Sequence, residues 1–152
     1  MANTQAMTTS FMQELLTGTH NFTTGTGDTF KAALYLASAT VNAATTAYSS
    51  TGEVTGTNYT AGGVTVTNGT SPASTNSSAT AGVAYWTPSA SITYTNVTLT
   101  TAFDAVLIYN SSKSDKAVSV HTFGSQTVTA GTFTLTMPTN NTTNALLRLA
   151  TT

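Results

Sequence analysis

The sequence contains no cysteine, so disulfides, thiolate nucleophiles and cysteine-ligated metal sites are excluded. Charge is scarce as well, because only 6% of residues are charged and the formal net charge is −1. A typical globular domain has about 25% charged residues. Without clustered lysine and arginine the chain cannot bind phosphates strongly, so we expect no nucleic acid or membrane partner. The N-terminal segment MANTQAMTTS has no basic region followed by an apolar run, so we expect neither a signal peptide nor a membrane span.

Short neutral polar side chains take the place of the missing charges. The chain has 38 threonines, 15 serines and 11 asparagines among its 152 residues. Threonine is β-branched and suits the exposed face of a strand, which it hydrates without a charge. Asn-x-Ser/Thr triplets are frequent in such a composition by chance, so we do not interpret them as glycosylation sites. They begin at Asn21, Asn58, Asn68, Asn76, Asn96, Asn110, Asn140 and Asn141.

The N-terminal region predicts one short helix over residues 9–17. Ser10 can cap this helix, Gln13 completes a weak capping box, and Gly18 ends it. A helix of this length is marginal alone, so its apolar stripe has to pack against its own sheet or against a neighbouring subunit. If its own sheet does not cover this stripe, we expect it to form an interface. The stripe consists of Phe11, Met12, Leu15 and Leu16.

From Phe30 onward the apolar period changes to two, which predicts strands. Residues 102–109 are apolar on both faces and are the candidate central strand. We expect turns at Asn68-Gly69 and over residues 110–115, and a flexible surface loop over about 70–81. The pattern favours one all-β domain over residues 1–152, an antiparallel β-sandwich of immunoglobulin-like or jelly-roll-like type behind the helix. The expected strands cover 30–36, 64–67, 83–86, 92–94, 97–99, 102–109, 117–123, 126–129, 132–137 and 145–150.

The few titratable side chains are scattered and show no catalytic or metal-ligand spacing. His121 and Asp104 could form a triad with one of many serines, but that hypothesis is unspecific because triads are recognised by geometry. The glycines of residues 51–67 are better explained by turns with positive φ than by a phosphate cradle, because no helix follows them. Trp86 could stack on a sugar together with Tyr85, Tyr94 and Tyr109, although aromatic residues in a small sandwich more often belong to the core. We therefore predict no catalytic, cofactor-binding or metal-binding residue.

Several stretches resemble, in the same order, a widespread group of small virion proteins of tailed phages. They are TQAMTTSFMQELLTGTHNF, GDTFKAALY, the glycine-rich TGEVTGTNYTAGGVTVT, YWTPSASITYTNVTLTTAFDAVLIYN and GTFTLTMP. The resemblance covers most of the chain, apart from residues 70–81 and the tail after Pro138. Its motifs are structural, so it implies membership of a phage particle and assigns no active residue.

The resemblance implies a non-enzymatic virion protein, assembled in the host bacterial cytoplasm, that binds the major capsid protein or other virion proteins. The leading expectation is a capsid decoration or cement protein that stabilises the outer shell, and a homo-oligomer such as a trimer is plausible. One alternative is an adaptor protein of the neck, tail or fibre. A second alternative, from another class, is a carbohydrate-binding module that uses Tyr85 and Trp86.

Overall fold

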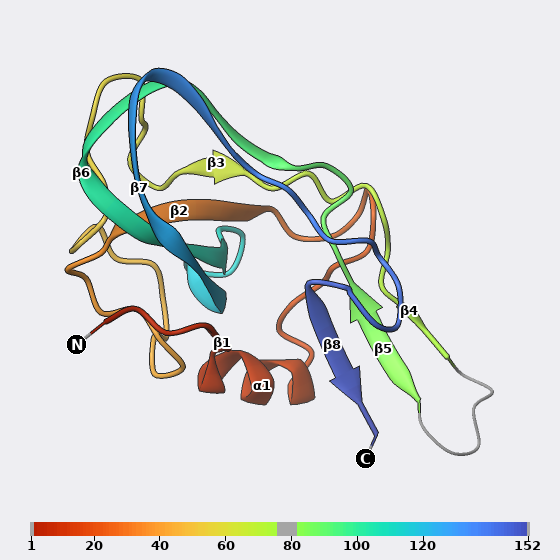
Figure 1. Cartoon of the computed structure of the whole chain (residues 1–152). Coiled ribbons are helices and arrows are strands. Elements are labelled where there is room, and N and C mark those ends of the chain that lie inside the picture. Colours follow the sequence, from red (N-terminus) through yellow and green to blue (C-terminus); the bar gives the residue numbers. More distant parts are fainter. Residues whose placement is uncertain (1, 76–81, 152) are drawn as a thin grey trace.

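A computed structural model describes residues 2–75 and 82–151, which form two antiparallel sheets and one short helix (Figure 1). The predicted fold class, an all-β sandwich with a short N-terminal helix, is confirmed. No helix in the described ranges is long and apolar enough to cross a membrane.

The larger sheet contains five strands in the order β1-β7-β6-β2-β3. Their bounds are Ala6–Met7 for β1, Phe30–Leu36 for β2, Val64–Thr65 for β3, Ile92–Asn110 for β6 and Lys116–Leu135 for β7. The central position of residues 102–109 is confirmed, because this part of β6 lies between β2 and β7. The turn predicted over residues 110–115 joins β6 to β7, with Ser114 and Asp115 at positive φ.

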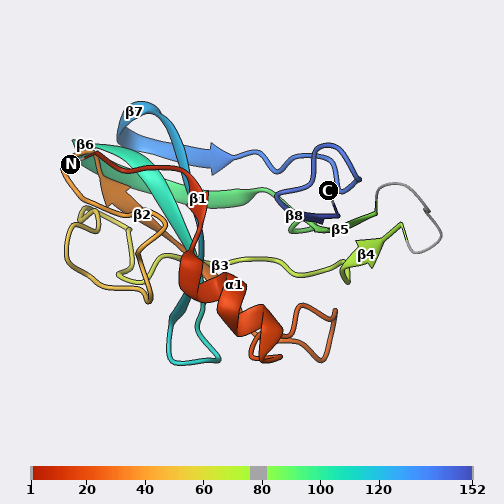
Figure 2. The same cartoon turned by 90° about the horizontal axis from the view of Figure 1, so that it is seen from below.

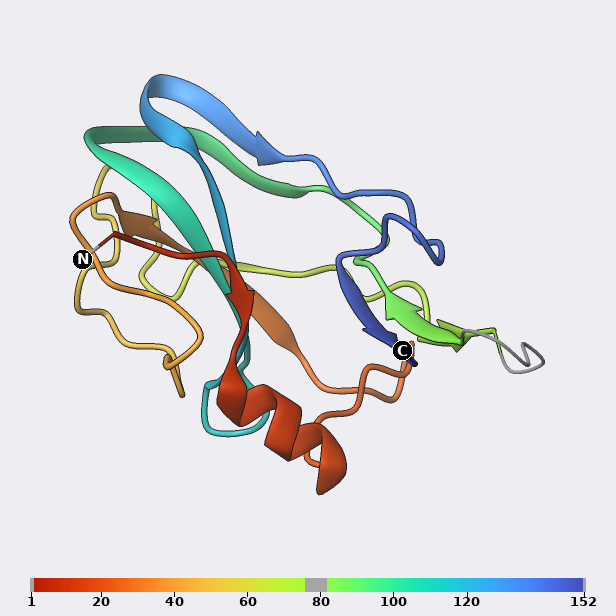
Figure 3. The ribbon, with the colours of Figure 1, turned by 60° about the horizontal axis from the view of Figure 1, so that its bottom comes forward.

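The strands β6 and β7 are longer than the sequence pattern predicts. The sequence pattern predicts three separate strands within each of them. In the structure β6 is continuous over 19 residues and β7 over 20. The interruptions at Asn96 and Ala130, both at positive φ, are β-bulge-like irregularities and not turns. They bend the hairpin, so that its far half curls over the face of the same sheet (Figure 3). A bulge and a turn use similar residues, which is why the local pattern could not distinguish them.

The smaller sheet has the order β4-β5-β8, formed by Ala73–Ser74, Val83–Trp86 and Leu147–Ala150. The strand β8 confirms the final edge strand expected within residues 145–150. The loop prediction for 70–81 is wrong at β4, which pairs through its backbone with Tyr85 and Ala84 and so needs no apolar side chain. Residues 76–81 of that prediction lie outside the described ranges.

The Asn68-Gly69 pair does not form the predicted turn of a hairpin, because the strands before and after it belong to different sheets. The Asn68 side chain instead accepts a hydrogen bond from Trp86 Nε1 at 3.1 Å and donates one to the Phe22 carbonyl at 2.9 Å. The chain therefore crosses from one sheet to the other at this point. Only β3, Val64–Thr65, forms from the expected strand 64–67.

Two apolar clusters cover the two faces of the large sheet. Val106 and Ile108 of β6 point into the larger cluster, and Ala105, Leu107 and Tyr109 point into the other. Alternating side chains of one strand thus reach both faces, as the period of two requires. The larger cluster is closed by residues from the helix, the following loop, β5 and the curled half of β6, namely Phe11, Phe22, Trp86, Ile92, Tyr94, Val97 and Leu99.

The helix α1, Thr9–Leu16, lies under the large sheet, and β1 leads into it along β7 (Figure 2). Thr8 caps the helix, and the prediction of Ser10 as the cap is wrong. The buried Thr8 hydroxyl accepts from the Phe11 N–H at 3.3 Å and donates to the Ala117 carbonyl of β7 at 3.1 Å. Thr8 is favoured because one side chain both caps the helix and ties it to the sheet. Gly18, at φ +66, ends the helix as predicted.

The glycine-rich segment packs against β2 and β6. Gly62 and Gly63 have φ of +87 and +71, which confirms that turns with positive φ explain these glycines. A Cβ at Gly63 would overlap the Ala32 carbonyl oxygen of β2, and one at Gly56 would overlap the Thr98 carbonyl oxygen of β6. The glycines therefore allow backbone to approach backbone.

We expect Gly63→Ala to lower the free energy of unfolding by about 2–5 kcal/mol, because it combines a strained backbone with overpacking. Gly25→Ala is the matched control, since Gly25 also has positive φ (+79) but open space around its missing Cβ. It should cost only about 1–2 kcal/mol. Urea denaturation of both variants measures the difference, and equal losses would show that the contact with β2 is unimportant.

Candidate functional site

An apolar groove lies between α1 and the small sheet, and it has a volume of about 100 Å³. β8 and α1 flank this region (Figure 1). Leu147 and Leu149 of β8 and Ala84 and Trp86 of β5 share one face of the small sheet, because the register pairs them directly. The full lining consists of Met7, Phe11, Leu15, Phe22, Pro72, Ala84, Tyr85, Trp86, Leu147 and Leu149.

The four residues of the predicted interface stripe have different environments. Phe11 is 2% exposed and belongs to the core, where it packs edge-on against Phe22. Leu15 is half-buried and lines the groove. Met12 and Leu16 are 45% and 88% exposed. The protein's own fold thus covers half of the stripe and leaves the rest accessible to a partner.

The sequence analysis missed Leu149, which is 45% exposed at the other side of the groove. The sequence predicts an edge strand within residues 145–150, but it does not show that α1 lies across the groove from this strand. The available signal was the alternation of Leu147 and Leu149 around Arg148, which is typical of a strand with one apolar face.

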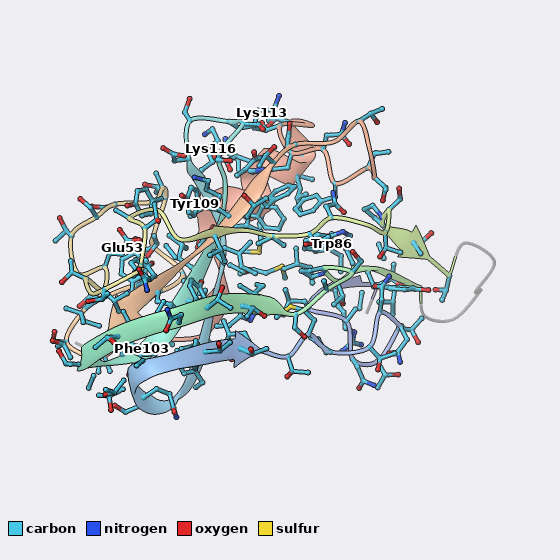
Figure 4. The ribbon with its side chains drawn as sticks, turned by 90° about the horizontal axis from the view of Figure 1, so that it is seen from above. Glu53, Trp86, Phe103, Tyr109, Lys113 and Lys116 are labelled. Carbon is cyan, nitrogen blue, oxygen red and sulfur yellow. The ribbon has the colours of Figure 1, made fainter. Side chains whose placement is uncertain are left out.

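Ionic contacts fix the inward side of α1. Glu14, although charged, is buried, and its carboxylate accepts hydrogen bonds from Lys116 Nζ at 2.5 Å and from His20 Nε2 at 2.7 Å. His20 Nδ1 accepts from the Asn110 amide at 2.9 Å, which assigns its proton to Nε2. Burial raises the pKa of Glu14, but the Lys116 and His20 contacts outweigh it and hold that pKa below its ordinary value. Lys116 lies beside α1 in Figure 4.

Asp28 continues this network into the loop after the helix. Its carboxylate accepts from the Asn110 amide and from the Asn21 N–H, both at 2.8 Å, and Lys113 Nζ is 3.6 Å away. Burial raises the pKa of Asp28, but these partners lower it below its ordinary value. The helix, the loop and the β6–β7 turn are thus held together by paired groups, which is a structural arrangement.

Glu53 is the centre of a second polar cluster that the sequence analysis did not recognise. This buried side chain accepts hydrogen bonds from the Tyr48 hydroxyl at 2.6 Å, the Tyr59 hydroxyl at 2.8 Å and the Gly62 N–H at 2.8 Å. The Tyr109 hydroxyl donates to the Gly62 carbonyl at 2.7 Å, and burial with nearby carboxylates raises the pKa of Tyr109 to about 12. Glu53 therefore holds the glycine-rich segment in shape, and the Tyr109 hydroxyl binds this segment to β6.

The unspecific triad of His121 and Asp104 is not assembled. His121 Nε2 is 2.9 Å from the Ser119 hydroxyl, whereas Asp104 accepts from the Asn3 amide at 2.6 Å. Ser119 is 1% exposed, so a substrate could not reach its hydroxyl. The two residues belong to separate structural contacts. Within the described residues no group of three acidic, histidine or cysteine side chains could hold a metal ion.

Trp86 is a core residue and is only 2% exposed. It is buried between the two sheets (Figure 4), where it packs against Phe22 and donates from Nε1 to Asn68 Oδ1 and to the Thr70 carbonyl. This confirms the core interpretation of the ring. Tyr85 is half-buried and lines the apolar groove.

We expect His121 to make the protein less stable in mild acid. Burial lowers the pKa of His121 from 6.5 to about 4, so between these values the unfolded chain binds a proton that the folded chain does not. The free energy of unfolding should therefore fall by up to about 3 kcal/mol as the pH drops from 6.5 to 4.

His121→Gln keeps a hydrogen-bonding group for Ser119 and should flatten this slope. Urea titrations at a series of pH values provide the measurement. Both proteins should still lose stability as the pH falls below the ordinary pKa values of glutamate and aspartate. The unfolded chain then binds protons that Glu14 and Asp28, whose pKa values are lowered, resist in the folded chain. An unchanged slope between pH 4 and 6.5 in the variant would contradict the assignment to His121.

Comparison with protein-family models, curated proteins and solved structures finds no match for this chain. No activity or partner is therefore transferred from a relative.

Proposed function

We propose that this chain is a non-enzymatic structural protein of a tailed-phage particle that decorates the outer shell and stabilises it by binding coat subunits. The observation that carries the proposal is the apolar groove with accessible side chains at both flanks, Leu16 and Met12 on α1 and Leu149 on β8. Exposed apolar surface beside a preformed groove is a common feature of protein-binding sites. The virion context of the proposal is what the sequence resemblance implies.

The titratable groups support a non-enzymatic role. Glu14 and Asp28 have structural partners, and Glu53 accepts hydrogen bonds from two tyrosine hydroxyls and a backbone N–H. Catalytic groups usually face a cavity that a substrate can enter. The groove described above is apolar and holds none of these groups among its lining residues.

Binding to a shell would rely on apolar and backbone contacts, because the chain carries few charges. Such contacts depend weakly on salt, since few ion pairs are available to be screened. Each contact can be weak, because repetition over a symmetric shell, or within a homotrimer, adds many of them together.

The copy number per particle tests the location. Quantitative mass spectrometry of purified particles of the phage that encodes this chain should find on the order of hundreds of copies, as expected for a shell lattice. About a dozen copies or fewer would instead place the protein at the neck, tail or fibre, and complete absence from the particle would refute the proposal.

We expect Leu16→Ser to reduce the occupancy of the chain on particles without unfolding it. Leu16 is 88% exposed, so its loss should change the free energy of unfolding by no more than about 0.5 kcal/mol. Gln13→Ser is the matched control, because Gln13 is also exposed on α1 but is polar. Occupancy is measured after complementing a phage that lacks the gene, and equal occupancy for both variants would exclude Leu16 from the interface.

A further inference from the structure

The strand β8 has an open edge next to the groove. It is the last strand of its sheet, and within the described residues it pairs with β5 alone. The Thr151 N–H donates to the Gly82 carbonyl across the same ladder at 2.9 Å. Because hydrogen-bonded and non-hydrogen-bonded pairs alternate in an antiparallel ladder, the N–H and C=O groups of Arg148 and Ala150 point away from β5. These groups can accept another strand.

The side chains of β8 specify what the added strand should carry. Leu147 and Leu149 line the groove, so the alternation of a strand directs Arg148 to the opposite face. Arg148 is exposed and has no ion-pair partner in the described part of the chain. A carboxylate opposite Arg148 on an added strand would supply that partner.

The chemistry of the groove defines which side chains it can take. Its volume is about 100 Å³ and its lining is apolar, so it suits aliphatic side chains. Residues on both sides of an acidic residue in an added strand point to the groove face of the sheet, because side chains alternate. The matching strand therefore has an apolar–acidic–apolar pattern.

We propose that β8 binds an extended segment of another protein by strand addition, with an apolar–acidic–apolar triplet opposite Leu147, Arg148 and Leu149. Backbone hydrogen bonds to Arg148 and Ala150 hold the segment, and the groove and Arg148 select its side chains. The identification of this segment as part of a shell protein rests on the proposed function. The chemistry of strand addition at β8 is independent of that function.

A second copy of this chain fits the edge less well. Antiparallel pairing of two β8 strands centred on Arg148 would place the two guanidinium groups opposite each other, which is destabilising. This chain has the required triplet at Phe103, Asp104 and Ala105, but these residues lie within the central strand β6 and pair with β2 and β7. The occupant is therefore a different protein.

Peptide binding to the full chain tests the side-chain preference. In anisotropy titrations, we expect the fluorescent peptide TTLELTT to bind about two- to fivefold more tightly than TTLKLTT. This is the difference in affinity that a cross-strand ion pair with Arg148 provides. Arg148→Glu should reverse this order. The proposal would be overturned if neither peptide bound, or if Arg148→Glu left the order of the two affinities unchanged.

Proline substitution tests the backbone edge. Ala150→Pro removes an N–H that points away from β5, so the fold should keep its melting temperature while TTLELTT binding falls at least about tenfold. Ala150→Thr keeps this N–H and should bind like the wild type. Equal peptide binding by both variants would overturn strand addition. Analytical ultracentrifugation tests the alternative occupant. A wild-type dimer that Ala150→Pro abolishes would also overturn the proposal, because a second copy would then occupy the edge.

Particle occupancy separates the two proposals. Loss of peptide binding by Ala150→Pro with unchanged occupancy on particles would overturn β8 as the docking edge and leave the decoration role intact. The chain could instead bind the peptides with the predicted preference and be absent from particles. This result would support strand addition and refute the decoration role.

Discussion

The burial of both faces of β6 is the constraint on which the rest of the molecule depends. Leu107 and Ile108 are adjacent and almost fully buried, yet they point into two different clusters. Each face therefore needs a cover of its own. On one face the cover is α1, β5 and the curled far half of the β6–β7 hairpin, and on the other face it is the chain just after β2, which carries Ala39, Val41 and Tyr48. The helix, the glycine-rich segment and the small sheet take their positions from this requirement.

Hydrogen bonds from neutral side chains do in this protein much of what ion pairs do elsewhere. The hydroxyls of Tyr48 and Tyr59 satisfy Glu53, and the Thr8 hydroxyl both caps α1 and binds β7. A buried polar group is costly when it lacks a partner, so these tyrosines and threonines stabilise the fold by satisfying it. The ion pairs found in the described residues gather around Glu14 and Asp28, where loops and helix meet the β6–β7 turn. Charge is thus used to join elements, while the surface stays nearly neutral.

The division of the helix stripe links this architecture to binding. Phe11 and Glu14 hold α1 against the large sheet, and this leaves Leu15 at the groove and Leu16 exposed. The small sheet contributes the other wall. At β8 it also has an edge whose outward backbone groups, and whose Arg148, have no partner among the residues that the structure describes. An apolar groove beside an open edge offers both a pocket and a ladder to one extended segment. This combination is the feature on which the proposed role in assembly rests.

Local periodicity was sufficient to predict the fold class, the helix, the strands 30–36 and 83–86 and the central position of residues 102–109, because alternation and glycine stops are properties of neighbouring residues. It was not sufficient to show that Asn96 and Ala130 are bulges within long strands, that Thr8 caps the helix, or that Ala73–Ser74 pair with β5, since each depends on a partner distant in sequence. The same limit applies to the candidate site. The stripe from Phe11 to Leu16 was recognisable as apolar, but its separation into core and accessible parts, and its meeting with Leu149, followed from packing between segments more than a hundred residues apart.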